Sequence, residues 1–455
     1  MKSLMNSLII NYRAVNNMDA VQSKKNPFLS VTRIFLMGLF SVCSVTAVAQ
    51  AVKILTIENA YLLARKNYPL IRQKDLINKS KDYSVSNAAK GYLPTLSANG
   101  QATYQSDVTT LPFKFSPGIT IPNYNKDQYK FFGEVDQIIY DGGAIRNQKQ
   151  TANANEAIQQ QNLEVELYGI YDRVNQLFFG LLLTDEQLKQ NALLKADIQN
   201  GIEKVNAQVK NGTAYRSSVD ELSAQLLETE QSQIGLVANK KAFLNMLGLF
   251  INIPLDENTI IESPATPVNT DSINRPELLF YDYQKRIYDL QSESLKIDLR
   301  PKFSFFFQGG YARPGLNFLS NDFAWYYIGG LRLSWNFGSL YRLNNQQRLL
   351  DIDKQQLDLQ KQTFLLNTAM TQKQESAEME KYIELSRNDE AIIALRASVK
   401  KAASAQLENG VLTVRDYLTE VNAEDQARQN RILHEVEMLQ TQYNYENTAG
   451  NLKVQ

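Results

Sequence analysis

The same series of landmarks occurs twice in this sequence, and this internal repeat limits the folds that the chain can adopt. Each half has a proline before an alternating segment, then a glycine that opens a long helical pattern, then an Asn-Gly pair. The landmarks are Pro94, Gly142 and Asn211-Gly212 in the first half, and Pro301, Gly338 and Asn409-Gly410 in the second. The order is the same in both halves, and the second glycine follows the first by 70 residues in one half and by 72 in the other, which indicates a tandem duplication. We therefore expect two structural repeats, residues 50–253 and 275–455, joined by a linker at residues 254–274 that is rich in Pro, Thr, Asn and Ser.

Between these landmarks the sequence has the period of long helices. Residues 144–210 contain no proline, and their apolar positions step by four and three. We expect one continuous helix there, on the order of 100 Å long at about 1.5 Å per residue, with a counterpart over residues 340–408. Both segments are rich in Gln, Asn, Ala, Lys and Glu and have narrow apolar seams. This composition favours a coiled-coil layer with one wet face over a buried globular core.

Four other segments, each of about ten residues, alternate apolar and polar side chains with a period of two. They lie near Tyr92–Tyr104, after Phe131, after Pro301 and around Tyr327–Phe337. One face of each is rich in aromatic and aliphatic residues. The opposite faces carry the charged residues Glu134, Asp136, Lys302 and Arg332. The pattern favours tilted membrane strands with charges toward a wet lumen; the alternative is a half-buried sheet covered by the helices.

Four strands are too few to close a barrel, because even a barrel filled by side chains takes about eight. Open strand edges are not tolerated in lipid. If the strands enter a membrane, the chain must therefore borrow the rest of the barrel from copies of itself.

The first 49 residues read as a signal peptide. Basic residues at Lys24, Lys25 and Arg33 precede a short apolar run that closes with Ala47-Val48-Ala49, and Met18 is a candidate for the true start. Cys43 lies inside the run, so we expect it to be removed with the signal. After this run we expect no transmembrane helix.

Composition excludes several functional classes. Lys+Arg and Asp+Glu are balanced at 48 each, which argues against a nucleic-acid binder. His434 and Cys43 are the single histidine and the single cysteine. One of each cannot build a metal site or a Cys/His dyad with any redundancy. We therefore expect no catalytic residues, no cofactor and no metal, and we interpret His434, in a helical stretch, as a surface or packing residue.

Six segments taken together resemble the TolC-type outer-membrane efflux protein family, over almost the whole chain after the signal. They are LTIENAYLLARKNYPLI, GYLPTLSANGQATY, IIYDGGAIRNQ, KNGTAYRSSVDELSAQLLETE, RPELLFYDYQ and ENGVLTVRDYLTEVNAEDQARQN. No one of these motifs is specific alone, but their ordered set is.

The resemblance implies a mixed, mainly α-helical fold in which three protomers each give four strands to one transmembrane β-barrel. The long helices then form a hollow α-barrel across the periplasm, with a belt of shorter elements around it. The implied function is not enzymatic: it is the passive outer-membrane channel of a tripartite efflux or type I secretion system. Such a channel docks on a periplasmic adaptor, a membrane fusion protein, and on an inner-membrane RND, ABC or MFS pump.

Channels of this family narrow where the helix pairs turn, which the resemblance places near Gly212 and Gly410. Asp416, six positions after Gly410, matches an acidic aperture position of the family. Leu412 stands where the best-known members have an arginine that bonds across the gap. Arg415 is the candidate substitute, so the closing network must differ here in detail.

The other gate positions match only in part. The next acidic position of the family is Thr419 here, with Glu420 adjacent. Ser218 stands six residues after the first tip glycine, where the family often has Asp, and Asp220 is two residues further on. The alternative for Asp416 and Asp220 is that they are helix-start acids favoured by the helix dipole.

A trimeric structural or adhesive coiled coil on the cell surface is the alternative function from another class. It accounts for the signal peptide and the long helices. It does not account for two amphipathic strand pairs inserted at matching points of a duplication.

Overall fold

The structure is a computed structural model that describes residues 54–109, 124–267, 270, 272–317 and 320–452. The expected signal peptide, with Met18 and Cys43, lies outside the described residues. Within the described part helices dominate, and strands form one four-stranded sheet and one short pair.

Each of the four alternating segments forms a strand, and the four strands make one antiparallel sheet in the order β2, β3, β5, β6. The strands are β2 (Thr95–Tyr104), β3 (Asp127–Tyr140), β5 (Lys302–Arg313) and β6 (Ala324–Ser334). The predicted bounds were too wide at one end of the sheet. Tyr92 precedes β2, and Trp335 follows β6 and donates a hydrogen bond from Nε1 to the Leu299 carbonyl at 2.8 Å.

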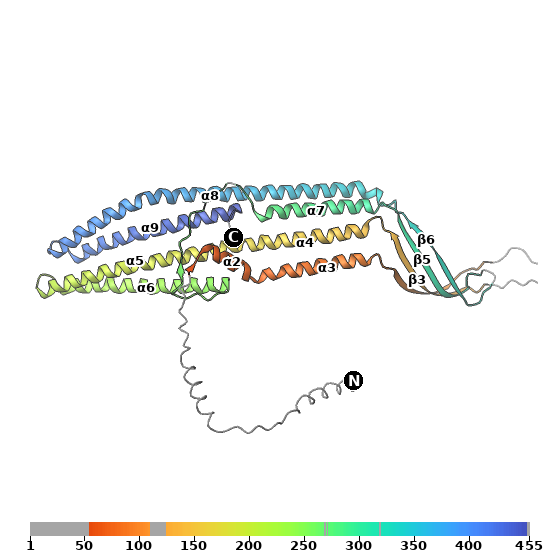
Figure 1. The fold of residues 1–455 in the computed structure, drawn as a ribbon, viewed down its shortest axis with the longest axis horizontal. Helices are drawn as coiled ribbons and strands as arrows, with labels where there is room; N and C mark the ends of the chain where they lie inside the picture. The colour runs from red at the N-terminus through yellow and green to blue at the C-terminus, as the bar shows by residue number, and fades with distance from the viewer. Residues whose placement is uncertain (1–53, 110–123, 268–269, 271, 318–319, 453–455) are drawn as a thin grey trace, which may run out of the picture. The chain divides into compact units, whose positions relative to one another are not determined.

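One helix joins each strand at the same end of the sheet. Helices α3 (Gln73–Lys90) and α7 (Pro276–Ile297) lead into β2 and β5, and α4 (Ala144–Tyr168) and α8 (Leu340–Glu408) follow β3 and β6. Helix α3 packs against α4, α4 against α7, and α7 against α8 (Figure 1). The helices therefore lie in the same lateral order as the strands that they continue.

Beyond this layer the helices pair as two hairpins. Helix α5 (Ile170–Lys210) packs against α6 (Arg216–Ile251), and α8 packs against α9 (Val414–Ala449). The two hairpins meet through contacts between α5 and α9 (Figure 1).

The expected continuous helix over residues 144–210 is interrupted, so that prediction was wrong. Helix α4 ends at Tyr168 and α5 begins at Ile170, because Gly169 donates its N–H to the Leu167 carbonyl instead of continuing the helical ladder. Glycine has the lowest helix propensity after proline. Leu167, Ile170 and Tyr171 beside the break are buried, and the rings of Tyr168 and Tyr171 pack edge to face with centroids 5.2 Å apart. The counterpart over residues 340–408 is one helix, α8.

The main hydrophobic core lies around this break. It joins α5, α6 and α9 to the short helix α2 (Ile57–Asn67), and its largest fully buried side chains include Tyr61, Phe178 and Phe179. Thr56 caps α2 by accepting the Asn59 N–H at 3.2 Å.

Segments from three parts of the chain surround the core. A 3-10 turn, η2 (Pro69–Arg72), follows α2, and β1 (Ile54–Leu55) pairs in parallel with β4 (Ile260–Ile261) from the expected linker. Tyr443 of α9 donates its hydroxyl to the Ala265 carbonyl at 3.0 Å. The N-terminal, linker and C-terminal segments thus gather where the resemblance implies a belt.

Candidate functional site

The register of the sheet determines which side chains share a face. Glu134 lies opposite Ser97 on β2 and Gln308 on β5, and Arg332 lies opposite Ser304. Directly opposite residues of paired strands point to the same face, and successive residues alternate. The four predicted lumen charges, Glu134, Asp136, Lys302 and Arg332, therefore all lie on one face of the sheet.

Three of these four charges form one cluster. Arg332 reaches Asp136 at 2.7 Å and Glu134 at 3.1 Å, and Gln308 donates to Glu134 at 3.1 Å. Arginine holds two carboxylates here through separate guanidinium nitrogens, an arrangement that its planar fork favours. Lys302 lies near the end of β5 opposite Ser334, outside the cluster. The charged face thus presents a cluster in which one arginine pairs with two carboxylates.

The charged face also carries aromatic rings that the alternation pattern did not reveal. The Lys130 ammonium lies over Phe132 at 4.7 Å and over Tyr326 at 5.3 Å from the ring centroids. The Arg332 guanidinium lies over Phe306 at 4.7 Å. Cations over ring faces are attracted by the ring quadrupole. These aromatic residues therefore support the basic side chains of this face.

The opposite face is apolar and uncovered. Its exposed members include Leu96, Phe131, Trp325, Tyr327 and Leu331, with 65–83% of each residue exposed. A large exposed apolar face marks a surface that contacts lipid or another protein.

Aromatic residues of this uncovered face gather at both ends of the strands. Tyr311 lies 5.3 Å from Phe323 and 5.1 Å from Trp325 between ring centroids, at the end away from the helices. Phe303 lies 6.3 Å from Tyr140 at the helix end. At about 3.4 Å per residue, Phe303 and Tyr311 are separated by about 27 Å along β5. At the tilt of about 35–45° usual for membrane strands, this length spans about 19–22 Å across the membrane, close to the apolar band of about 25 Å between the aromatic girdles of membrane barrels.

The two helix tips are built on glycine. Gly212 and Gly410 have φ of 72° and 69°, a left-handed conformation that costs glycine little. Each turn closes by a backbone hydrogen bond, from Thr213 to Gln208 at 2.9 Å and from Val411 to Gln406 at 2.9 Å. The chain therefore reverses its direction within a few residues at the end of each long helix.

Asp416 lies in the first turn of α9, whose N-cap is Thr413. The Thr413 hydroxyl accepts the Asp416 N–H at 3.2 Å and donates to Asp416 Oδ2 at 2.6 Å. This is a helix-start arrangement, in which an acidic group also meets the positive end of the helix dipole. Asp416 remains exposed, and so does the adjacent Arg415, for which the described residues provide no ion-pair partner.

The other gate candidates do not meet Asp416. Glu420 forms an ion pair with Arg396 of α8 at 3.6 Å. Ser218 donates its N–H to the Tyr215 carbonyl at 3.1 Å, and Asp220 is exposed in the first turns of α6. Within one protomer these residues are spread over two tips, and the structure brings no two of their side chains together.

A polar network that the sequence did not reveal joins the two hairpins just behind the tips. Lys400 of α8 contacts Asp197 of α5 at 2.8 Å and also pairs with Glu424 of α9. Arg428 donates to Glu424 at 2.7 Å. Only 5% of the Glu424 side chain is exposed, so Lys400 and Arg428 stabilise its negative charge in place of water.

Opposing effects determine the charge states in this network. Burial would raise the pKa of Glu424, but hydrogen bonds from Lys400 and Arg428 hold that pKa below its ordinary value. Burial would lower the pKa of Lys400, but hydrogen bonds to Asp197 and Glu424 raise it above its ordinary value. Of these contacts, only Glu424 with Arg428 has a spacing, four residues on one helix, that a sequence pattern could have indicated.

A second, weaker set of polar bonds runs beside the network. Gln190 of α5 donates to Asp425 of α9 at 2.9 Å, and Gln208 donates to the Leu407 carbonyl at 2.9 Å. Apolar side chains of all four tip helices fill the space between them, among them Val205, Leu222 and Val421. The tips are thus held by one small apolar cluster and several polar links.

His434 is not a simple surface residue. Its Nδ1 lies 2.9 Å from Oδ2 of Asp389, whose side chain is 7% exposed, so the pair links α9 to α8. No group of three or more His, Cys, Asp or Glu side chains suited to a metal ion occurs among the described residues.

Helix α6 is long and apolar enough, by length and composition alone, to cross a membrane, whereas no transmembrane helix was expected after the signal run. Its Leu244, Leu247 and Ile251 are buried in the main core. Lys240 lies within the same helix and pairs with Asp185 of α5 at 2.5 Å. These contacts account for the buried apolar residues of α6, while Leu227, Ile234 and Leu249 of the same helix are exposed.

Comparison with protein families gives one match: residues 60–249 match the family described as outer membrane efflux protein. The match spans α3, the first strand pair and the α5–α6 hairpin. No curated protein matches the sequence.

Solved structures of outer-membrane channels share the fold. The outer membrane protein VceC from Vibrio cholerae aligns with a TM-score of 0.61 at 14% identity, over 87% of this chain and 96% of that chain. The CmeC outer membrane channel of Campylobacter jejuni aligns with a TM-score of 0.60 at 11% identity, over 87% of this chain and 85% of that chain. The open-state MtrE outer membrane channel of Neisseria gonorrhoeae aligns with a TM-score of 0.61 at 12% identity, over 87% and 89%. At such identities the likeness is one of fold.

Proposed function

For this chain, a TolC-type outer-membrane efflux protein that lies in the outer membrane and extends into the periplasm, we propose the role of a passive exit duct. Three copies form the duct, and each gives four strands to one transmembrane β-barrel. Below the barrel the long helices close into a hollow α-barrel.

The edges of the four-stranded sheet are the observation that carries this proposal. Strand β2 pairs only with β3, and β6 pairs only with β5, so one edge of each outer strand is free within the described chain. The same sheet has an uncovered apolar face suited to lipid. A free edge beside lipid leaves backbone groups without partners, each at a cost of several kcal/mol. Pairing β2 of one copy with β6 of the next removes every edge.

The helix layer has matching free edges. Helix α3 lies at the β2 side of the layer and exposes Leu76 and Tyr83, seven residues apart. Helix α8 lies at the β6 side and exposes Ile352, Leu359 and Leu366 at the same seven-residue spacing. A seven-residue apolar repeat is the seam of a coiled coil. Two copies that pair β2 with β6 would therefore also pack α3 of one protomer against α8 of the next.

The two faces of the sheet support a conducting barrel. The apolar face has aromatic residues at both ends, and the opposite face carries the cluster of Arg332, Glu134 and Asp136. A barrel closed with this orientation has a wet, charged lumen. A trimeric surface coiled coil does not account for a sheet with one charged face and one apolar face suited to lipid.

Two structural repeats, residues 50–253 and 275–455, account for this arrangement. In both halves a helix leads into a strand pair, and a long helical segment and a hairpin follow. The linker at residues 254–274 contributes β4 to the central belt.

We place the gate at the helix tips. Asp416 and Arg415 are exposed there and free to meet other copies around a threefold axis, and Lys400 holds the two hairpins of each protomer together. A periplasmic adaptor and an inner-membrane RND, ABC or MFS pump would dock on the periplasmic end, and the pump would supply the energy that the channel itself lacks.

Disulfide trapping tests the proposed assembly. Cysteine at Tyr83 and at one of the α8 seam positions, Ile352, Leu359 or Leu366, should give covalent dimers and trimers on mild oxidation in at least one pairing. The single variants Tyr83→Cys and Leu359→Cys are the controls and should remain uncrosslinked. A monomer in solution with no crosslink in any pairing would refute the trimer.

A further inference from the structure

Each of the four helices that meet the sheet carries an exposed basic residue close to the strands. Lys90 ends α3 and Lys296 lies one residue before the end of α7, while Arg146 and Arg342 are the third residues of α4 and α8. All four lie between five and eight residues from the end of a strand, and the four helices reach the sheet at the same end (Figure 1). These four residues, the basic collar, therefore lie at about one level of the molecule.

The two arginines occupy equivalent positions in the two structural repeats. Arg146 lies four residues after Gly142, and Arg342 lies four residues after Gly338. A cation in the first turn of a helix meets the positive end of the helix dipole, where an acidic residue is favoured. Helix stability therefore accounts for the two lysines of the collar, which lie in last turns, but not for the two arginines.

The acidic residues nearest in the chain do not neutralise the collar. None of the four collar side chains forms an ion pair or a hydrogen bond within the described residues. Asp141 accepts the Ile145 N–H at 2.6 Å at the start of α4, and Glu293 pairs with Arg300 at 2.7 Å. Asp298 is exposed and pairs with none of the four.

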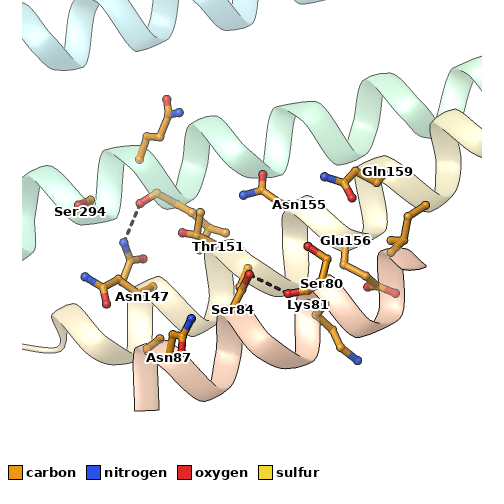
Figure 2. A pocket seen from close by; sticks show the side chains of 16 residues that line it. Ser80, Lys81, Ser84, Asn87, Asn147, Thr151, Asn155, Glu156, Gln159 and Ser294 are labelled. Atoms are coloured by element: carbon orange, nitrogen blue, oxygen red, sulfur yellow. Dashed lines mark hydrogen bonds between the residues drawn. The ribbon is translucent and has the colours of Figure 1, made fainter. Parts of the chain in front are cut away.

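The groove between α3, α4 and α7 does not supply a counter-charge either. Figure 2 shows that hydroxyl and amide side chains dominate its lining. Asn147, next to Arg146, donates from Nδ2 to the Leu290 carbonyl at 3.3 Å. The one carboxylate of the lining, Glu156, accepts a hydrogen bond from Gln160 and lies about 15 Å along α4 from Arg146. The collar therefore carries a positive charge that the described part of the protomer does not neutralise.

Exposed aromatic residues lie where the collar meets the apolar face of the sheet. Trp335 and Phe337 are exposed, with ring centroids 4.7 Å apart, and Tyr341 in the first turn of α8 is 89% exposed. The Lys149 ammonium of α4 lies over the Tyr92 ring at 5.8 Å from its centroid. Aromatic rings and long basic side chains together are typical of protein surfaces at the headgroup level of a bilayer.

We propose that the basic collar binds the acidic headgroups of phospholipids in the leaflet nearest the helices. The collar rests on the proposed membrane barrel, which places the helix end of the sheet at the periplasmic leaflet. The headgroup layer of one leaflet is about 5–8 Å thick. Long basic side chains that start within about 8–12 Å of the strands extend into that layer. There the lipid phosphates supply the negative charge that the collar lacks, and an arginine can hold two phosphate oxygens at once.

Spin-label electron paramagnetic resonance tests the collar on the full-length protein in phosphatidylcholine vesicles. A spin-labelled lipid loses mobility while it contacts the protein, so the immobilised fraction reports how strongly each headgroup is held. Wild type should hold phosphatidylglycerol about threefold more strongly than phosphatidylcholine, because basic residues near the surface attract acidic lipids. The double variant Arg146→Gln/Arg342→Gln should lower this ratio to below about twofold. It removes two charges that the helix dipole disfavours, so the variant should fold.

Arg387→Gln is the matched control. Arg387 is an exposed arginine of α8 that lies about 68 Å along this helix from Arg342, so its loss should leave the lipid ratio at the wild-type value. Equal retention of the two lipids by wild type would overturn the collar, and so would a ratio that the double variant does not change. Retention of neither lipid would refute the membrane barrel and the collar together, which distinguishes that failure from failure of the collar alone.

Discussion

Replacing Phe307 with arginine tests which face of the sheet meets lipid. Phe307 lies near the middle of β5, opposite Val135 and Gly329, and is 42% exposed. An arginine on the lipid face at the bilayer midplane costs about 2–4 kcal/mol, so three copies cost about 6–12 kcal/mol per trimer. The lost ring contact with Tyr327, at 6.1 Å between centroids, adds about 0.5–1.5 kcal/mol per copy. The sum is about 2.5–5.5 kcal/mol per copy, a large fraction of the stability of a folded domain, about 5–15 kcal/mol, so assembly should fail.

Gln308→Arg is the matched control. Gln308 is the next residue on β5, points to the opposite face and donates to Glu134 at 3.1 Å. An arginine there meets a carboxylate and a wet lumen, so the trimer should form at near wild-type yield. Heat-modifiable trimer in outer-membrane fractions, measured on gels run with and without boiling, gives both yields. Equal yields for the two variants would show that the inside and outside faces are wrongly assigned.

The other predictions concern the gate and the helix packing. Asp416→Ala should raise trimer conductance in planar bilayers and weaken cation preference; wild-type values of both would leave Asp416 as a helix cap only. Lys400→Met leaves Glu424 with one basic partner, so it should raise conductance more than Lys401→Met, a control at an exposed neighbouring position. Equal conductances of the two variants would exclude the network from gating. Burial raises the pKa of Glu375 to about 7. A raised pKa means that the ionised form is disfavoured in the folded state, so stability should fall as the pH rises from about 4.5 through 7. After allowance for solvent screening the loss should be on the order of 1 kcal/mol. Glu375→Gln should abolish this dependence in urea unfolding between pH 5 and pH 8, and an unchanged pH profile would contradict the assignment.

The sequence predicted the gate only in part. Asp416 was visible because it lies at a fixed distance from a tip glycine, but its pairing with Thr413 equally suits a helix cap. Lys400 was not visible, because its partners Asp197 and Glu424 are distant in sequence and come from two other helices. No local pattern distinguishes such a lysine from its exposed neighbour Lys401.

Local periodicity and glycine placement determined much of this protein from the sequence alone. Alternation with a period of two located the strands, and proline-free helical patterns ending at Gly212 and Gly410 located the hairpins, because both depend on backbone geometry within a few residues. Only the tertiary structure decided that α4 and α5 separate at Gly169. It also decided that Arg332 joins Glu134 and Asp136, and that Lys400 joins Asp197 to Glu424. These features depend on which distant segments pack together, and a linear pattern does not encode the distance between side chains that only the fold brings into contact.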